Sequence, residues 1–319
     1  MRYRLSVLLC IVICLAGCSA SSSVIHPYKM DELSSAGISY KTTRLESFSQ
    51  GQIYLKDNSA YPVENVSAGQ ALVFELDGKE DPVLLCKNAY QQFDPGFLVR
   101  LIAAYMVAET SDIYSDVTVT GDIFQIDKEL PASGFVNGDK VSVKDLIYGS
   151  TMYGKCDCVI PLALFYSARI SDYLTDLNET IKDKGLSQTA VTSIYGVPSS
   201  GQYTTIYDLY LLLPRILSNK DIYDAVTARS YECNYTSNGS ANTLNMFNQL
   251  PYFCENGFNS TSGLAIIGGL CDTRDDSNSS MLVIAQTAGG KKYVAYVAGC
   301  TSYENTKTQM EIILSKILN

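Results

Sequence analysis

The sequence predicts an α+β fold in which an antiparallel sheet is flanked by helices and a helical subdomain is inserted between the strands. Three observations support this fold class. Two apolar runs, 71–76 and 83–86, surround a glycine turn and open the domain as a hairpin. Runs with apolar residues at helical spacing fill the middle of the chain, and two strand-like runs followed by a helix end it. Because strands stand at both ends of this order, we expect the first and last strands to share one sheet.

The predicted elements follow one another along the chain. After the hairpin turn at Asp77-Gly78-Lys79, helices are expected at 97–108, 143–152, 159–168, 171–184 and 206–217. The last of these contains Pro214, which lacks a backbone N–H, so we expect that helix to be broken or bent there. Strands at 281–288 and 292–298 meet at Gly289-Gly290, and 306–318 is an amphipathic closing helix.

The first eighteen residues have the pattern of an export signal. Arg2 and Arg4 precede an apolar stretch at 5–15, which is shorter than the roughly 20 residues that a membrane-spanning helix needs. Leu15-Ala16-Gly17-Cys18 resembles the bacterial lipoprotein signal, which implies that Cys18 becomes a lipid-carrying N-terminus. The alternative is an ordinary secretory signal with an incidental cysteine.

The chain therefore divides into three expected parts. Residues 1–18 form the lipoprotein signal peptide, 19–69 form a tether and N-terminal segment, and 70–319 form the main domain, with its helical part at about 97–218. We expect the mature protein to lie outside the cytoplasm, lipid-anchored to a bacterial cell membrane.

Charge and histidine content exclude several functions. The net charge is -9, and removal of Arg2 and Arg4 with the signal would bring it to -11 (-9 minus 2). Phosphate binding requires clustered Lys and Arg, and the sequence has no basic run, so we expect no nucleic-acid partner. His26 is the single histidine, which excludes a Ser-His-Asp triad and a histidine-rich zinc site. We expect no metal and no other cofactor.

Four segments carry a resemblance to a known family. They lie at 83–105, 143–149, 201–209 and 268–299. Together they resemble the D-alanyl-D-alanine carboxypeptidases, which are the low-molecular-weight penicillin-binding proteins of the serine beta-lactamase-like superfamily. The resemblance covers about 70–319 and implies the penicillin-binding-protein fold and a place in peptidoglycan metabolism.

The catalytic positions of that family are altered at the first motif. Asp94-Pro95-Gly96-Phe97-Leu98-Val99-Arg100 stands where the family has Asp-Pro-Ala-Ser-Leu-Thr-Lys, so Phe97 replaces the serine and Arg100 the lysine. Phenylalanine has no nucleophilic atom, and a guanidinium with a pKa above about 12 is no base near neutral pH. No lysine in the sequence has a Ser or Thr three residues before it, so the motif is not displaced elsewhere.

The second and third motifs are altered as well. Gly154-Lys155-Cys156-Asp157 stands in the place of Ser-Gly-Asn-Asp. Cys271-Asp272-Thr273 stands in the place of Lys-Thr-Gly, and an alignment with an insertion would choose Asn259-Ser260-Thr261 instead. Neither choice restores the lysine, and Asp272 would repel the substrate carboxylate that this strand holds in the family. The resemblance thus implies that no catalytic residue is retained.

Seven cysteines remain once the signal is removed and Cys18 is lipidated: Cys86, Cys156, Cys158, Cys233, Cys254, Cys271 and Cys300. Seven is odd, so at least one thiol is left over. The resemblance places Cys156 and Cys271 across the former catalytic cleft, which implies a disulfide of Cys271 with Cys156 or Cys158. Inert buried thiols and a metal or redox site at Cys156-Asp157-Cys158 are the alternatives. A second candidate disulfide joins Cys233 to Cys254, beside an insertion at 245–263.

We therefore expect a non-catalytic D-alanyl-D-alanine carboxypeptidase-like lipoprotein that binds peptidoglycan stem peptides or a cell-envelope protein. Arg100 and Lys155 are the candidate binding residues, and Arg100 either holds a carboxylate or pairs with a nearby acid. One alternative is an active serine-type carboxypeptidase with an unconventional site. The other is a thiol-dependent envelope protein that uses Cys156-Asp157-Cys158.

Overall fold

The structure, a computed structural model, describes residues 55, 65–78, 82–251, 263–272 and 278–318. They belong to one compact unit, Gln52–Asn319. Several predicted features lie outside the described residues, namely the signal peptide with Cys18, His26, Cys254, Asn259-Ser260-Thr261 and Thr273.

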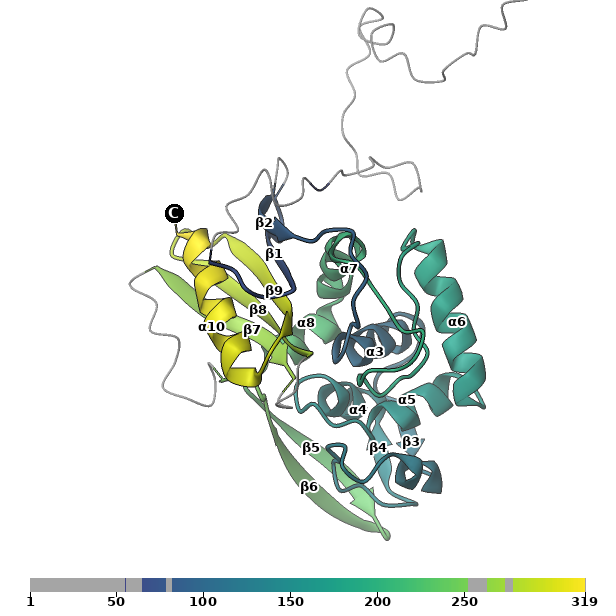
Figure 1. The fold of residues 1–319 in the computed structure, drawn as a ribbon. Coiled ribbons are helices and arrows are strands. Elements are labelled where there is room, and N and C mark those ends of the chain that lie inside the picture. Colours follow the sequence, from purple (N-terminus) through teal and green to yellow (C-terminus); the bar gives the residue numbers. More distant parts are fainter. Residues whose placement is uncertain (1–54, 56–64, 79–81, 252–262, 273–277, 319) are drawn as a thin grey trace, which may run out of the picture. The chain divides into compact units, whose positions relative to one another are not determined.

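The central sheet has five antiparallel strands in the order β2-β1-β9-β8-β7 (Figure 1). The strands are β1 (Gln70–Glu75), β2 (Val83–Lys87), β7 (Leu264–Cys271), β8 (Ser279–Thr287) and β9 (Lys292–Cys300). The first strand pairs with the last, with Gln70 opposite Ala298 and Glu75 opposite Tyr293. The prediction that the terminal strands share one sheet is confirmed.

Each strand divides its side chains between two cores because successive residues point to opposite faces. In β1, Leu72 and Phe74 lie in the core that the sheet shares with the middle helices, whereas Ala71 and Val73 lie in a smaller core on the other face. The helix α10 (Tyr303–Leu314), followed by η2 (Ser315–Ile317), covers that second face (Figure 1). The two-sided burial explains why these strands read as continuous apolar runs.

The helices between β2 and β7 form a layer on the other face of the sheet (Figure 1). They are α3 (Leu98–Thr110), α4 (Val143–Ser150), α5 (Val159–Tyr166), α6 (Ile170–Asp183), α7 (Ile206–Ser218) and α8 (Lys220–Thr227), with a short 3-10 helix η1 (Gly121–Gln125). All five predicted helices are confirmed, and α8 was not predicted. Of the two expected effects of Pro214, the break is absent, because α7 continues through this residue.

Local capping explains where several helices begin. Ser142 accepts the backbone N–H of Asp145, whose side chain accepts the backbone N–H of Ser142, so a capping box starts α4. Thr205 caps α7 by accepting the N–H of Asp208, and Asn219 caps α8. These contacts fix the entry points of the helices that carry the middle of the domain.

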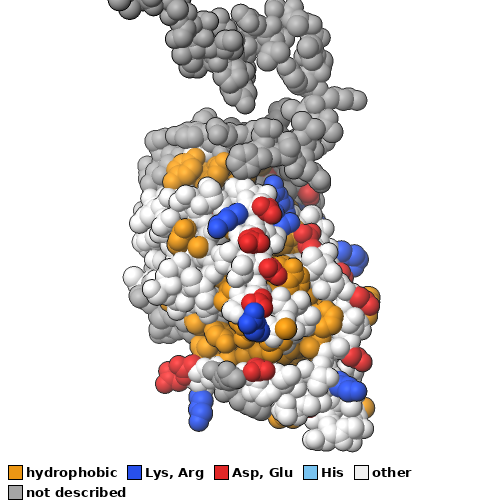
Figure 2. All heavy atoms as spheres, turned by 90° about the vertical axis from the view of Figure 1, so that its right-hand side faces the viewer, with side chains coloured by type: hydrophobic (Ala, Val, Ile, Leu, Met, Phe, Trp, Pro, Cys, Tyr) orange, Lys and Arg blue, Asp and Glu red, His pale blue; other side chains and the backbone are white. Residues whose placement is uncertain are grey.

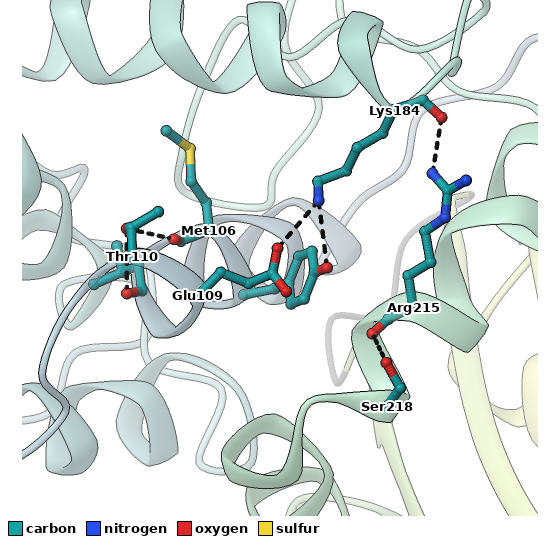
Figure 3. Close-up of polar contacts among 8 residues, drawn as sticks. Met106, Glu109, Thr110, Lys184, Arg215 and Ser218 are labelled. Atoms are coloured by element: carbon teal, nitrogen blue, oxygen red, sulfur yellow. Dashed lines mark hydrogen bonds and ion pairs between the residues drawn. The ribbon is translucent and has the colours of Figure 1, made fainter. Parts of the chain in front are cut away.

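Lys184, the residue that follows α6, ties three helices together (Figure 3). Its Nζ lies 3.1 Å from Oε2 of Glu109 and donates to the hydroxyl of Tyr105 at 3.5 Å, both on α3. Its carbonyl accepts a hydrogen bond of 2.8 Å from Nη1 of Arg215 on α7. Burial is the main cause that raises the pKa of Tyr105, so its hydroxyl stays protonated.

A second sheet, which was not predicted, has the strand order β3-β4-β5-β6. Its strands are β3 (Asp116–Thr118), β4 (Lys140–Ser142), β5 (Ser230–Ser237) and β6 (Ser240–Phe247). The two longer strands form a hairpin whose turn, Asn238-Gly239, has positive φ at both residues, as a two-residue turn of the I′ type requires.

Figure 2 views the face of the molecule that carries α6. Acidic side chains run down this face with hydrophobic and a few basic ones around them, and no cluster of basic side chains is seen there. Among the described helices, none is both long and apolar enough to cross a membrane.

Candidate functional site

The N-terminus of α3 holds the first motif in a fixed conformation. Gly96 adopts a left-handed φ of 53°, and its N–H donates to Oδ1 of Asp94 at 2.8 Å. The turn directs Phe97 into the core between the sheet and the helices, where it is 2% exposed. The position of the family's serine is therefore filled by a packed aromatic ring.

Arg100 follows one turn later and is 7% exposed. Its Nε donates to the carbonyl of Ser150 at 3.0 Å and its Nη1 to the carbonyl of Tyr195 at 2.8 Å. Nη1 also lies 3.6 Å from Sγ of Cys156. The expected alternative of pairing with a nearby acid is wrong for the described part of the chain, where Arg100 bonds to carbonyls and to a thiol.

The loop that contains Tyr195 approaches Arg100 because Gly196 leaves room for it. A Cβ on Gly196 would lie 2.6 Å from Nη1 of Arg100 and 3.1 Å from Cα of Phe97. Gly196 also has a φ of 71°, which L side chains rarely adopt. The glycine thus lets backbone cover the guanidinium from this side.

The second motif forms one wall of the site. The backbone N–H of Cys156 donates to the carbonyl of Pro131 at 2.8 Å. Asp157 accepts the N–H and the hydroxyl of Ser133, at 2.9 and 2.7 Å, so the one motif residue that matches the family serves to hold this loop. Lys155 places its Nζ 4.5 Å from the ring centroid of Tyr153.

The third motif also lines the site, at the end of β7. Sγ of Cys271 donates to the carbonyl of Gln249 at 3.0 Å. The backbone N–H of Asp272 bonds to the carbonyl of Ser280 at 3.1 Å, and the residue is buried. Thr273, the last residue of this motif, lies outside the described residues.

The three motif regions meet around one small pocket of about 100 Å³. Its lining residues are Arg100, Pro131, Tyr153, Gly154, Lys155, Cys156, Gln249, Cys271 and Asp272. Each of the three motifs thus contributes at least one residue to the same pocket, whereas Phe97 and Asp157 do not line it. The sequence patterns did not indicate Pro131, Tyr153 or Gln249.

The predicted disulfide of Cys271 with Cys156 or Cys158 is not present. Cys156, Cys158 and Cys271 are all buried thiols in the structure. The physical reason lies in where the sulfurs point: that of Cys156 faces Arg100, and that of Cys271 faces the carbonyl of Gln249. The partner expected for Cys233, Cys254, lies outside the described residues, and Cys233 is also a buried thiol.

Two of the buried thiols, Cys158 and Cys233, do not have the surroundings of reactive cysteines. Burial raises the pKa of Cys158 well above its ordinary value, and the nearby Asp157 raises it further. Burial is also the main cause that raises the pKa of Cys233. A reactive cysteine needs a lowered pKa and access to solvent, so Cys158 does not suit the thiol-dependent alternative, which leaves Cys156, beside Arg100, as its candidate. No group of three metal-ligating side chains lies together within the described ranges.

Asp208, the third residue of α7, holds the segment that contains Gln188 and Thr189. Its Oδ2 accepts the N–H of Gln188 at 2.8 Å and the hydroxyl of Thr189 at 2.7 Å. Burial raises the pKa of Asp208, while these two hydrogen bonds lower it in part. None of residues 201–209 is among those that line the pocket.

Comparison with known proteins identifies relatives of this arrangement. A family model described as D-alanyl-D-alanine carboxypeptidase matches residues 55–263. A D-alanyl-D-alanine carboxypeptidase of Streptomyces sp. (strain K15) is 26% identical over 241 residues, which cover 72% of this chain and 80% of the relative. The carboxypeptidase DacD of Salmonella typhimurium is 23% identical, and the match covers 75% of this chain and 60% of that protein.

Solved structures share the fold. The DD-transpeptidase of Streptomyces K15 matches with a TM-score of 0.69 at 20% identity, over 80% of this chain and 98% of that one. Penicillin binding protein 5 from Haemophilus influenzae matches with a TM-score of 0.65 at 16% identity, over 78% of this chain and 70% of that one. The predicted α+β, penicillin-binding-protein-like fold is confirmed.

Proposed function

Because the chain belongs to the D-alanyl-D-alanine carboxypeptidase family, we propose that it is a member that binds peptidoglycan stem peptides without hydrolysing them. The observation that carries the proposal is the chemistry of the pocket. No serine or threonine is among its described lining residues, and the position of the nucleophile belongs to Phe97 in the core.

Acyl transfer in this family depends on a serine and a lysine one helical turn apart, which exchange a proton. Arg100 occupies the lysine position, but a guanidinium does not give up its proton near neutral pH. It also donates to two backbone carbonyls, which hold it in place. Both halves of the nucleophilic pair are therefore missing from α3.

The pocket is nevertheless kept, and its charges suit a peptide end. Two cations, Arg100 and Lys155, line it together with one acid, Asp272. Relatives named carboxypeptidases act at the carboxyl ends of peptides, so a carboxylate-terminated stem peptide is the ligand that both family and charge favour. A cell-envelope protein is the other partner that the sequence suggests.

The N-terminal sequence supports an extracytoplasmic, lipid-anchored location. The charged and apolar pattern before Leu15-Ala16-Gly17-Cys18 supports export and attachment through a lipid on Cys18. Labelling of cells with a palmitate analogue should tag the wild-type protein and leave a Cys18→Ala variant untagged. A tagged variant would place the lipid elsewhere, and an untagged wild type would favour the ordinary secretory signal.

The lack of turnover can be tested directly. We expect no covalent band with fluorescent penicillin and no D-alanine released from a muramyl pentapeptide analogue, in an assay where the Streptomyces relative serves as the active control. Calorimetric titration with the same peptide should show saturable binding. A covalent adduct with D-alanine release would instead establish an active serine-type peptidase with an unconventional site.

A further inference from the structure

Arg100 is a buried cation whose charge no described carboxylate neutralises. Three contacts hold it, to the carbonyls of Ser150 and Tyr195 and to Sγ of Cys156, and none of these groups is a carboxylate. A buried charge without an opposite charge is costly in a folded protein. The site is therefore poised to gain stability from an anion.

The direction of the guanidinium shows where that anion would lie. Nε and Nη1 make the three contacts given above, and Nη2 takes part in none of them. Nη2 lies 4.0 Å from the place that a Cβ on Gly154 would occupy. Gly154 and Arg100 both line the pocket. The Nη2 edge of the guanidinium therefore faces the part of the pocket that Gly154 forms. The absence of a side chain on Gly154 keeps this approach open.

Lys155 adds a second cation to the same wall. It makes no ion pair with the acids of the described part, and its Nζ is held over the ring of Tyr153, a third lining residue. Asp272 of the third motif is the one acidic residue among those that line the pocket. Two positive charges against one negative charge leave the pocket with a net charge of about +1, which matches a monoanion.

The size of the pocket limits what enters it. Its volume of about 100 Å³ is well above the ~15 Å³ that one water needs and below the ~300 Å³ of a site for a drug-sized ligand. It can take a carboxylate with a small side chain, and the rest of a peptide would have to stay outside.

We propose that Nη2 of Arg100 and Nζ of Lys155 together bind the terminal carboxylate of a peptide in this pocket. The carboxylate then lies on the wall formed by α3 and the second motif, away from Asp272 on the third motif. The identity of the peptide rests on the proposed function, whereas the carboxylate chemistry rests on the pocket itself.

Calorimetric titration of the protein with three probes tests this inference. The probes are N-acetyl-D-alanyl-D-alanine, its C-terminal amide and sodium propionate. We expect the acid to bind about tenfold or more tightly than the amide, a difference of ~1.4 kcal/mol, because the amide lacks the charge. Equal affinities of acid and amide would overturn the carboxylate site and leave peptide binding intact.

The other outcomes separate the two proposals. Binding of propionate without binding of either dipeptide would support the carboxylate site and refute the stem peptide as ligand. Binding of neither carboxylate would overturn the inference.

Variants locate the binding to the two cations. Arg100→Gln should abolish the preference for the acid over the amide, but it also removes buried hydrogen bonds and can prevent folding. Lys155→Gln avoids that difficulty, since the Lys155 side chain is partly exposed, and it should weaken acid binding about three- to tenfold. Lys182→Gln, an exposed site on α6, makes the same charge change outside the pocket and should leave affinity unchanged. An equal effect of the two lysine variants would mean that only net charge matters, which would overturn the site.

Discussion

Phe97 stands where the family has its nucleophilic serine, and the contribution of its packing to stability can be measured. Phe97 is 2% exposed in the core between the sheet and the helices. Burial of a phenylalanine side chain contributes ~1.5–3 kcal/mol, and the cavity left by its truncation brings the usual cost of Phe→Ala to ~3–5 kcal/mol. We therefore expect Phe97→Ala to lower the free energy of unfolding by about 3–5 kcal/mol.

The matched control is Phe247→Ala, the same substitution at a site on β6 that is 58% exposed. Its effect should stay within roughly 0.5 kcal/mol, as for most surface changes. Urea unfolding followed by circular dichroism measures both variants, with the free energies taken from the midpoint and slope. If Phe97→Ala costs no more than Phe247→Ala, Phe97 does not fill the core and the position of the nucleophile is open to a ligand.

Three further predictions concern buried groups around the site. Asp157→Asn should cost about 1.5–3 kcal/mol in thermal unfolding, because a charged acceptor for Ser133 is lost; an unchanged midpoint would show that the loop does not depend on it. Asp208 has a raised pKa in the folded state, so it favours folding most at acid pH, and its contribution falls as the pH rises from the unfolded pKa of about 3.9 through the folded one. Unfolding free energies measured from pH 3 to 7 should show a downward component that Asp208→Asn removes, and parallel curves for the two proteins would contradict the raised pKa. Cys158 should react with iodoacetamide at pH 8 only on unfolding, given its burial and raised pKa, and rapid labelling of the native protein, mapped by mass spectrometry, would revive the thiol-dependent alternative.

The central sheet and the main helices could be predicted because their patterns are strong. Strands β8 and β9 are buried on both faces and therefore read as long apolar runs. The second sheet could not be found this way, since most side chains of β5 and β6 are at least partly exposed and few of them are apolar. The one signal for that hairpin was Asn238-Gly239, a dipeptide typical of two-residue turns.

The sequence predicted which residues form the candidate site, but not which groups they contact. The motif positions predicted that Arg100, Cys156 and Cys271 would lie close together, and these three residues line one pocket. The partners of Arg100 are backbone carbonyls, which any residue can supply, so no sequence pattern could indicate them. The direction of each sulfur depends on side-chain rotamers, which explains why the disulfide prediction was wrong.

The pairing of β1 with β9 has a consequence for how the chain folds. Gln70 lies opposite Ala298, 228 positions further along (298 minus 70), so the centre of the sheet cannot form until almost the whole chain has been made. Closing so long a loop costs entropy before any contact repays it, and such topologies fold slowly. The central sheet of a nascent chain would therefore form late, which leaves Leu72 and Phe74 of β1 exposed and available to chaperones until β9 has been synthesised.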